Sequence, residues 1–282
     1  MAAPLKRRGL LHMGNSPLKS GNSPLKSGAI YSLSPRGMGI LAAMAKAKRK
    51  TPLKSKAAPR ERRLTWHGLR RWSLRGLVVA VVLPVLYVMA LAFVNPPITP
   101  YIWSERARLG EVRWNWVDLE DMPPHVARSF VAAEDANFCL HWGFDMGAIR
   151  LALEEGANRG ASTISQQVVK NVFLWHARSW PRKALEAVLT PVMEATWSKR
   201  RIIEVYLNVA ELDEGVFGVG AAGPWYFGVE AGALSAAQAA RLAAVLPAPK
   251  VRSAKEASAR SRSIADGAAT IRADGRAACF ES

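Results

Sequence analysis

The chain lacks several signals that identify common classes of protein. Alternation of apolar and polar residues, which marks a half-buried strand, is weak throughout, so we predict an all-α fold. No His-Glu-x-x-His or similar metal-ligand motif is present, so we expect no tightly bound metal, and any divalent cation would arrive with a substrate. Cysteine is scarce. The two that occur, Cys139 and Cys279, can form one internal disulfide at most.

Acidic residues are nearly absent from the first 75 positions. This stretch holds 18 Lys and Arg against the single acid Glu61, which accounts for the whole net charge of +17. A pI near 10.5 ordinarily suggests nucleic acid. The excess lies in one tail beside an apolar run, however, so we expect membrane lipid and no nucleic acid as its partner.

The apolar run covers residues 76–94 and contains no charge. As a helix it would extend roughly 28 Å, close to the thickness of a bilayer core, and it predicts one transmembrane helix. A buried core helix or a cleaved signal peptide are the alternatives, but about 75 residues precede the run, and residues 95–101 make a poor cleavage site. Arg70, Arg71 and Arg75 precede the run, which places the N-terminus in the cytoplasm and the remainder outside, on the periplasmic side of an inner membrane.

The tail before this run, residues 1–75, contains a tandem heptad at Gly14–Ser20 and Gly21–Ser27. Its richness in Ser, Pro, Gly and cations predicts disorder, because such a stretch cannot bury a core. Each heptad includes a Ser-x-x-Lys spacing, which we interpret as chance since no folded scaffold surrounds it. Met38 and Met44 offer downstream starting points for translation.

Residues 95–250 are expected to form one helical domain. Helical spacing of apolar residues marks segments near Val126–Val131, Leu185–Val192 and Ile202–Leu207. Ser235-x-x-Gln238 is a capping box that predicts a further helix start. Residues 251–282 are polar and rich in alanine, and we expect a loose helix and tail there.

Two short blocks, residues 134–145 and 160–171, concentrate acids, amides, a hydroxyl and cations. Thr163-x-x-Gln166 is a capping box, so a helix should begin at Thr163. One face of that helix would carry Thr163, Gln167, Lys170 and Asn171, groups suited to holding phosphate oxygens, although a solvated polar face is the alternative.

A helix opening at Ser179-Trp-Pro should present Arg182, Lys183 and Glu186. Taken alone, Arg182 and Glu186 at spacing i, i+4 are typical of a plain surface ion pair. The interpretation changes when these residues are considered together with the two polar blocks.

The order and spacing of these segments resemble the glycosyltransferase family 51 domain, over roughly Val131 to Lys250. Five motifs carry the resemblance: Glu134, Asp135, Phe138, His141 and Gly143; the run Gly160–Asn171; Arg182, Lys183 and Glu186; Lys199, Ile202, Ile203, Glu204, Tyr206, Leu207 and Asn208; and Gly215–Gly218 with Tyr226–Gly228. Only 32 residues follow Lys250, and they contain no Ser-x-x-Lys or Lys-Thr-Gly, so no transpeptidase domain is expected. The resemblance is to the monofunctional biosynthetic branch of the family.

Three departures from the family pattern stand out. The stretch between Asp145 and Gly160 is several residues shorter than usual, which puts lipid contacts in doubt. Gly220 stands where a charged residue is common, and Val229 replaces the usual cation after Tyr-Phe-Gly. We expect these two changes to affect only packing.

The resemblance implies a lysozyme-like helical domain that polymerises lipid II, the growing glycan strand being the donor. The implied general base is Glu134, and the second essential carboxylate is Glu186. Lys170 and Arg182 would stabilise the leaving diphosphate, with Mg²⁺ as a companion of that group. The remaining implied roles are positioning, by Thr163, Gln167 and Asn171, and shaping of the first loop, by Asp135, Phe138 and His141. Proteins of the divisome or penicillin-binding proteins would be partners.

Two rival functions remain open. A lytic transglycosylase or muramidase would share the helical fold and a catalytic glutamate, but needs no diphosphate site. A non-enzymatic membrane scaffold would need neither Glu134 nor Glu186. The cysteines also leave two alternatives: on the external, oxidising side of the membrane Cys139 and Cys279 would pair, or Cys139 would be a free thiol filling an apolar niche.

Overall fold

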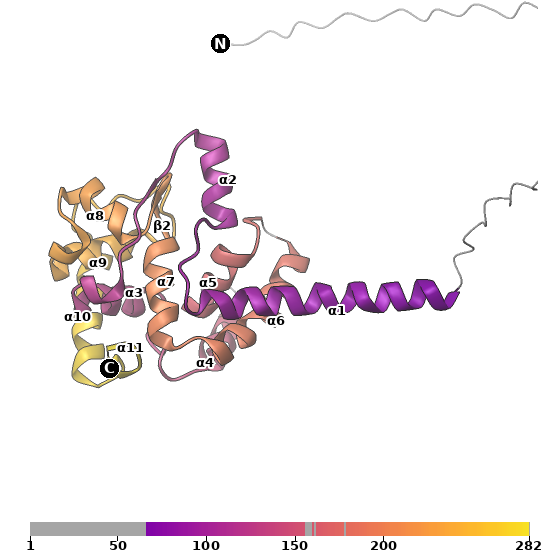
Figure 1. The fold of residues 1–282 in the computed structure, drawn as a ribbon. Helices are drawn as coiled ribbons and strands as arrows, with labels where there is room; N and C mark the ends of the chain where they lie inside the picture. Colours follow the sequence, from indigo (N-terminus) through magenta and orange to yellow (C-terminus); the bar gives the residue numbers. More distant parts are fainter. Residues whose placement is uncertain (1–65, 156–159, 161, 178, 282) are drawn as a thin grey trace, which may run out of the picture. The chain divides into compact units, whose positions relative to one another are not determined.

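The computed structural model describes residues 66–155, 160, 162–177 and 179–281 (Figure 1). Residues 1–65, most of the tail predicted to be disordered, lie outside the described residues. Residues 66–75 are helical, so the prediction of disorder is wrong for them. The helix of the adjacent apolar run continues through these positions, since Leu and Arg are good helix formers.

Helix α1, Trp66–Leu91, contains most of the predicted transmembrane run. Among the described residues it is the one helix long and apolar enough to cross a membrane. Its apolar side chains are mostly exposed, and burial begins at its C-terminal end with Val88 and Leu91. There the indole of Trp197 donates a hydrogen bond to the Val88 carbonyl at 2.8 Å. Arg201 binds the carbonyls of Leu91 and Val94 at 3.0 to 3.2 Å, so α1 is joined to the domain that follows.

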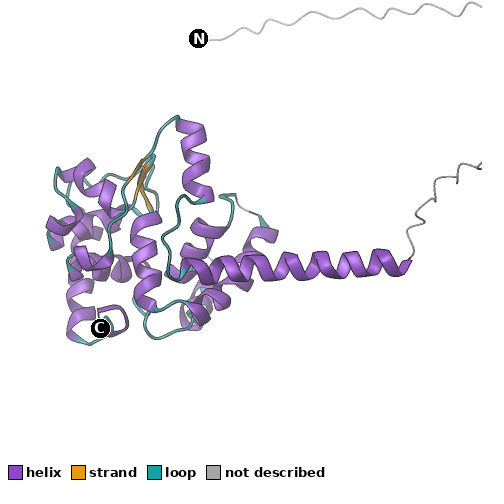
Figure 2. Ribbon diagram, viewed as in Figure 1, coloured by secondary structure: helices purple, strands orange, loops and turns teal. Residues whose placement is uncertain are grey.

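The domain after α1 is mostly helical, which confirms the predicted fold class (Figure 2). Its helices are α2 (Pro100–Leu109), α3 (Pro124–Glu134), α4 (Met146–Glu154), α5 (Ile164–Phe173), α6 (Trp180–Thr196), α7 (Lys199–Val209), α8 (Val219–Phe227), α9 (Ala236–Val245), α10 (Ala259–Ala273) and α11 (Ala278–Glu281). Two short 3-10 helices cover Leu119–Asp121 and Ala231–Ala233.

Among the described residues, one small sheet interrupts the helices. It consists of β1 (Arg113–Trp114), β2 (Glu211–Asp213) and β3 (Val216–Phe217), in the order β1-β3-β2. Strand β3 pairs parallel to β1 and antiparallel to β2. Strands of two or three residues are too short to show the alternation that sequence analysis depends on.

Helix α7 supplies much of the core. Ile202, Ile203, Tyr206 and Leu207 are fully buried, and α5 packs against the helix. Complete burial of such side chains stabilises by about 1.5 to 3 kcal/mol each. The core therefore fixes α5, the helix expected to carry most of the functional residues.

Local capping signals placed the helix starts well. Thr163 caps α5 and Ser235 caps α9, each with the full capping box predicted for it. Helix α6 begins after Ser179, whose hydroxyl accepts a hydrogen bond from the Arg182 backbone nitrogen.

The C-terminal segment is not loose, which corrects our prediction. Helix α10 packs on α3 and α9, burying Ile264, Ala268 and Ile271, and Phe280 in α11 is 1 % exposed. The apolar residues recur at i, i+4 and i+7 among alanines, and the small side chains let the helices approach closely. An added Cβ at Gly267 would lie 3.3 Å from Ala132 on α3.

Candidate active site

A cavity of about 670 Å³ lies beside α5. Four predicted substrate-binding residues line it: Gln167, Lys170 and Asn171 on α5, and Arg182 on α6. Three of the four residues of the predicted face of α5 thus line a cavity, which favours the functional interpretation over a solvated polar face, while Thr163 does not line it. The other walls come from α2, β2 and the segment 246–251.

Glu134 is the last residue of α3. It does not line the cavity itself but binds Gln167, which does. The Gln167 amide donates to Glu134 Oε2 at 3.1 Å, and the Tyr206 hydroxyl donates to Gln167 Oε1 at 3.2 Å. Burial raises the pKa of Glu134, while the bond from Gln167 and the charges of Arg260 and Lys170 act in the opposite direction. A raised pKa suits a carboxylate that accepts a proton near neutral pH.

Two cations face the cavity from adjacent helices. Burial lowers the pKa of Lys170, an effect opposed by the Glu186 carboxylate and reinforced by the charge of Arg182. The Arg182 guanidinium binds Glu186 Oε2 at 2.7 Å and the Ala177 carbonyl at 2.6 Å. Lys170 and Arg182 together give one side of the cavity a positive charge. Cations that are already fixed in position can stabilise an anion without moving.

Glu186 itself is held behind this side of the cavity. Its carboxylate is 2 % exposed and accepts from both Arg182 and Lys183. A plain surface ion pair, the simpler interpretation of this spacing, is therefore wrong for these residues. Glu186 is outside the cavity lining and holds the Arg182 guanidinium that lines it.

Residues of the first block form a hydrogen-bond network with the N-terminal end of α5. Asp135 accepts from the His141 ring at 2.9 Å and from the Ile164 backbone nitrogen at 3.0 Å. Phe138 is fully buried. The Thr163 hydroxyl donates to the Gly143 carbonyl at 2.7 Å. These residues join the loop after α3 to the N-terminus of α5, and they stand outside the cavity lining.

Two buried polar atoms in the described residues have no hydrogen-bond partner, His141 Nδ1 and Asn171 Oδ1. Asn171 lines the cavity. An unsatisfied buried acceptor is costly, so Asn171 Oδ1 is an available contact for the donor group of a ligand.

Sequence reasoning missed the opposite wall of the cavity. There the Tyr101 hydroxyl binds Glu211, and Lys250 Nζ lies 2.9 Å from Glu105 and 3.5 Å from Glu211. His176 packs on the Tyr101 ring, and burial lowers its pKa to about 4, so it is neutral at pH 7. No motif signalled this group, because its members come from segments far apart in the sequence.

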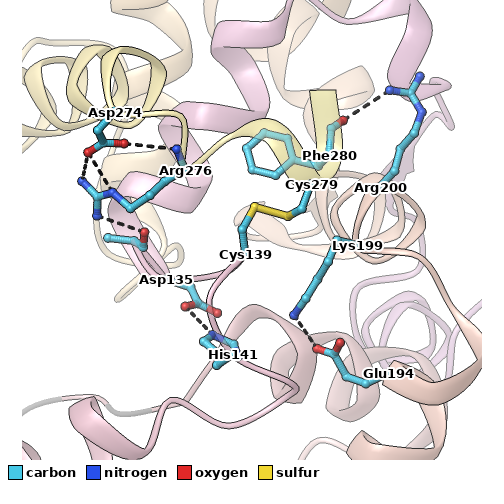
Figure 3. The surroundings of a disulfide bond; sticks show 11 residues. Asp135, Cys139, His141, Glu194, Lys199, Arg200, Asp274, Arg276, Cys279 and Phe280 are labelled. Carbon is cyan, nitrogen blue, oxygen red and sulfur yellow. Dashed lines mark hydrogen bonds and ion pairs between the residues drawn. A yellow bond between two sulfur atoms is a disulfide. The ribbon is translucent and has the colours of Figure 1, made fainter. Parts of the chain in front are cut away.

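The two cysteines form a disulfide, with Cα atoms 5.7 Å apart (Figure 3). It joins the loop of the first block to α11, which confirms the paired alternative. Within the described residues, no group of three or more His, Cys, Asp or Glu could hold a metal ion.

The family model for transglycosylases matches residues 104–269 of the chain. The chain belongs to the transglycosylase family. It is therefore a glycosyl-transferring enzyme, and the match extends beyond the five motifs into α10.

Curated relatives of this transglycosylase cover most of its length. It is 58 % identical over 231 residues to a biosynthetic peptidoglycan transglycosylase of Jannaschia sp. (strain CCS1), covering 80 % of this chain and 97 % of the relative. It is 41 % identical over 219 residues to the Caulobacter vibrioides protein of that name, covering 75 % and 96 % respectively. A third relative of the same name, from Ectopseudomonas mendocina, is 45 % identical over 194 residues, 65 % of this chain and 80 % of the relative.

Proposed function

We propose that this transglycosylase polymerises the glycan strands of peptidoglycan from lipid II, with the growing strand as donor. The observation that carries the proposal is the link from a partly buried carboxylate, Glu134, through Gln167 to a cavity walled by Lys170 and Arg182. The names of the curated relatives support peptidoglycan as the product. The residues of the site support the proposed chemical steps.

The reaction joins a sugar hydroxyl to an anomeric carbon. The 4-hydroxyl of the GlcNAc of lipid II attacks C1 of the MurNAc that ends the growing strand, and the C1–oxygen bond to undecaprenyl diphosphate breaks with inversion. An alcohol is a weak nucleophile, so its proton must leave as the new bond forms. Glu134 takes that proton, and the Tyr206–Gln167 pair orients the carboxylate.

The departing diphosphate develops negative charge, which fixed cations stabilise in a partly desolvated cavity. Lys170 and Arg182 would perform this task, which is supported by their position in the cavity lining and by the bond from Arg182 to Glu186. Asn171 Oδ1 would accept from a ligand hydroxyl or amide. Mg²⁺ would reach the cavity bound to the diphosphate.

We further propose that α1 anchors the enzyme with its N-terminus in the cytoplasm. Arg70, Arg71 and Arg75 lie at one end of the span, and the hydrogen bonds of Trp197 and Arg201 hold the domain at the other end. The cavity would then stay close to the membrane that carries the lipid-linked substrate. A periplasm-specific reporter should be active when fused after Ser282 and inactive when fused before Trp66.

Product analysis tests the proposed function. The purified full-length enzyme, incubated with labelled lipid II in detergent, should form long glycan that a muramidase degrades. Release of anhydro-muropeptides from peptidoglycan without polymer would show the lytic alternative. No product in either assay, from folded protein, would favour the membrane scaffold.

A further inference from the structure

Two arginines from a distant part of the chain, Arg260 and Arg276, bind backbone carbonyls at or just beyond the C-terminal end of α3. The last carbonyls of a helix lack partners within the helix and carry partial negative charge. At this end the Arg260 guanidinium donates to the Ala133 carbonyl at 3.4 Å. In the loop that follows α3, the Arg276 guanidinium donates to the Ala136 carbonyl at 3.2 Å. Both arginines belong to the C-terminal segment 259–281, which includes α10 and α11.

The first of these arginines also faces the proposed base. Arg260 Nη2 lies 3.6 Å from Glu134 Oε1, while Gln167 binds the other carboxylate oxygen, Oε2. The two oxygens are thus held by different elements, α10 and α5. Arg260 stands outside the cavity lining, so we assign it no contact with substrate.

The same segment holds the loop that follows Glu134. The Cys139–Cys279 disulfide joins the two (Figure 3). The ring of Phe280 lies 6.2 Å from that of Phe138. Asp274 fixes the Arg276 guanidinium at 2.7 Å, which keeps it on the Ala136 carbonyl. The loop is therefore held on both sides of residue 137.

We propose that the C-terminal segment 259–281 positions the catalytic carboxylate, with Arg260 as the positioning residue for Glu134. The inference rests on the proposed role of Glu134 as the base. Arg260 orients the carboxylate and favours its ionised form, the form that accepts a proton. The disulfide and Arg276 hold the loop after Glu134 against the C-terminal segment, and so fix its position relative to α10.

Other charges also act on Glu134. Lys170 on α5 favours the ionised carboxylate, whereas Asp135 disfavours it, and the Tyr206 hydroxyl on α7 reaches it through Gln167. None of these changes when Arg260 is replaced. Loss of Arg260 should therefore raise the pKa of Glu134 and move the acidic limb of the rate profile to higher pH.

The test compares the pH profiles of lipid II polymerisation by the full-length enzyme and three arginine variants, with Glu134→Gln as a fourth variant that checks the base assignment. Arg260→Gln removes the charge, Arg260→Lys keeps it, and Arg262→Gln makes the same charge change at an exposed position of α10. The Arg260 side chain is 40 % exposed, so we expect up to about a fivefold loss of kcat on the acidic side. The deficit should shrink at higher pH, where Glu134 is ionised in every arginine variant, to the small part that reflects its lost orientation, and KM should change little.

Arg260→Lys should recover most of the activity, and Arg262→Gln should match the wild type. The proposal is supported if the acidic limb of the rate profile moves to higher pH in Arg260→Gln and stays in place in Arg262→Gln. If its limb coincides with that of the wild type while Glu134→Gln is inactive, Arg260 has no positioning role and the base assignment stands. If Glu134→Gln polymerises normally, the proposed function fails independently of Arg260.

Discussion

Replacing Cys139 and Cys279 by serine should lower the stability of the enzyme markedly. The disulfide spans a sequence separation of 140 residues. In the chain-entropy model a loop of this length restricts the unfolded chain by about 5 kcal/mol, and measured losses for native disulfides are about 2 to 5 kcal/mol. For a domain of this size each kcal/mol shifts Tm by roughly 2 to 4 °C. We therefore expect Tm to fall by about 4 to 20 °C.

Circular dichroism melting of the full-length enzyme in detergent measures this change. Reductant supplies the control, since it should lower the Tm of the wild type toward that of the double variant and leave the variant unaffected. Two alkylated thiols in unreduced protein, or a Tm within about 2 °C of the wild type, would refute the reasoning.

Two further predictions concern packing and charge. Gly220→Ala should destabilise the fold by about 1 to 3 kcal/mol or more, because its Cβ would lie 2.3 Å from the Asn115 carbonyl oxygen and 2.7 Å from Val117 Cγ2. Denaturant unfolding would show the loss, which should be absent in Gly160→Ala, where the added Cβ meets open space. Lys170→Ala should lower kcat about 100- to 1,000-fold, as expected for a lost electrostatic contact to the leaving group. It should also weaken binding of moenomycin, a phosphoglycolipid that the family resemblance implies is a mimic of the donor. Unchanged moenomycin affinity in this variant would place the diphosphate elsewhere.

The sequence predicted those parts of the structure that depend on nearby residues. The start of α5 follows from Thr163 and Gln166, three positions apart. The side chain of each accepts a hydrogen bond from the backbone nitrogen of the other. The polar face of α5 follows from helical periodicity alone. Gly220 looked like a change that affects only packing, and the structure gives the reason, since no Cβ fits against Asn115.

The features that were missed depend on contacts between distant segments. Tyr101 and Glu211 are 110 positions apart, and no local pattern marks such a pair. The C-terminal segment looked loose because alanine contributes little apolar area, yet its small side chains let α10 pack closely on α3. The pairing of Arg260 with Glu134 depends on that packing, so it was beyond sequence reasoning.

The most direct test of the central claim is the rate of lipid II polymerisation by Glu134→Gln. The amide keeps the size of the side chain and one acceptor oxygen for Gln167 but accepts no proton at neutral pH. Glu256→Gln, at an exposed loop position, is the matched control. With the melting curve unchanged, we predict a fall of at least about 100-fold for Glu134→Gln and none for Glu256→Gln. A Glu134→Gln enzyme that polymerises labelled lipid II at nearly the wild-type rate would contradict the assignment of Glu134 as the base.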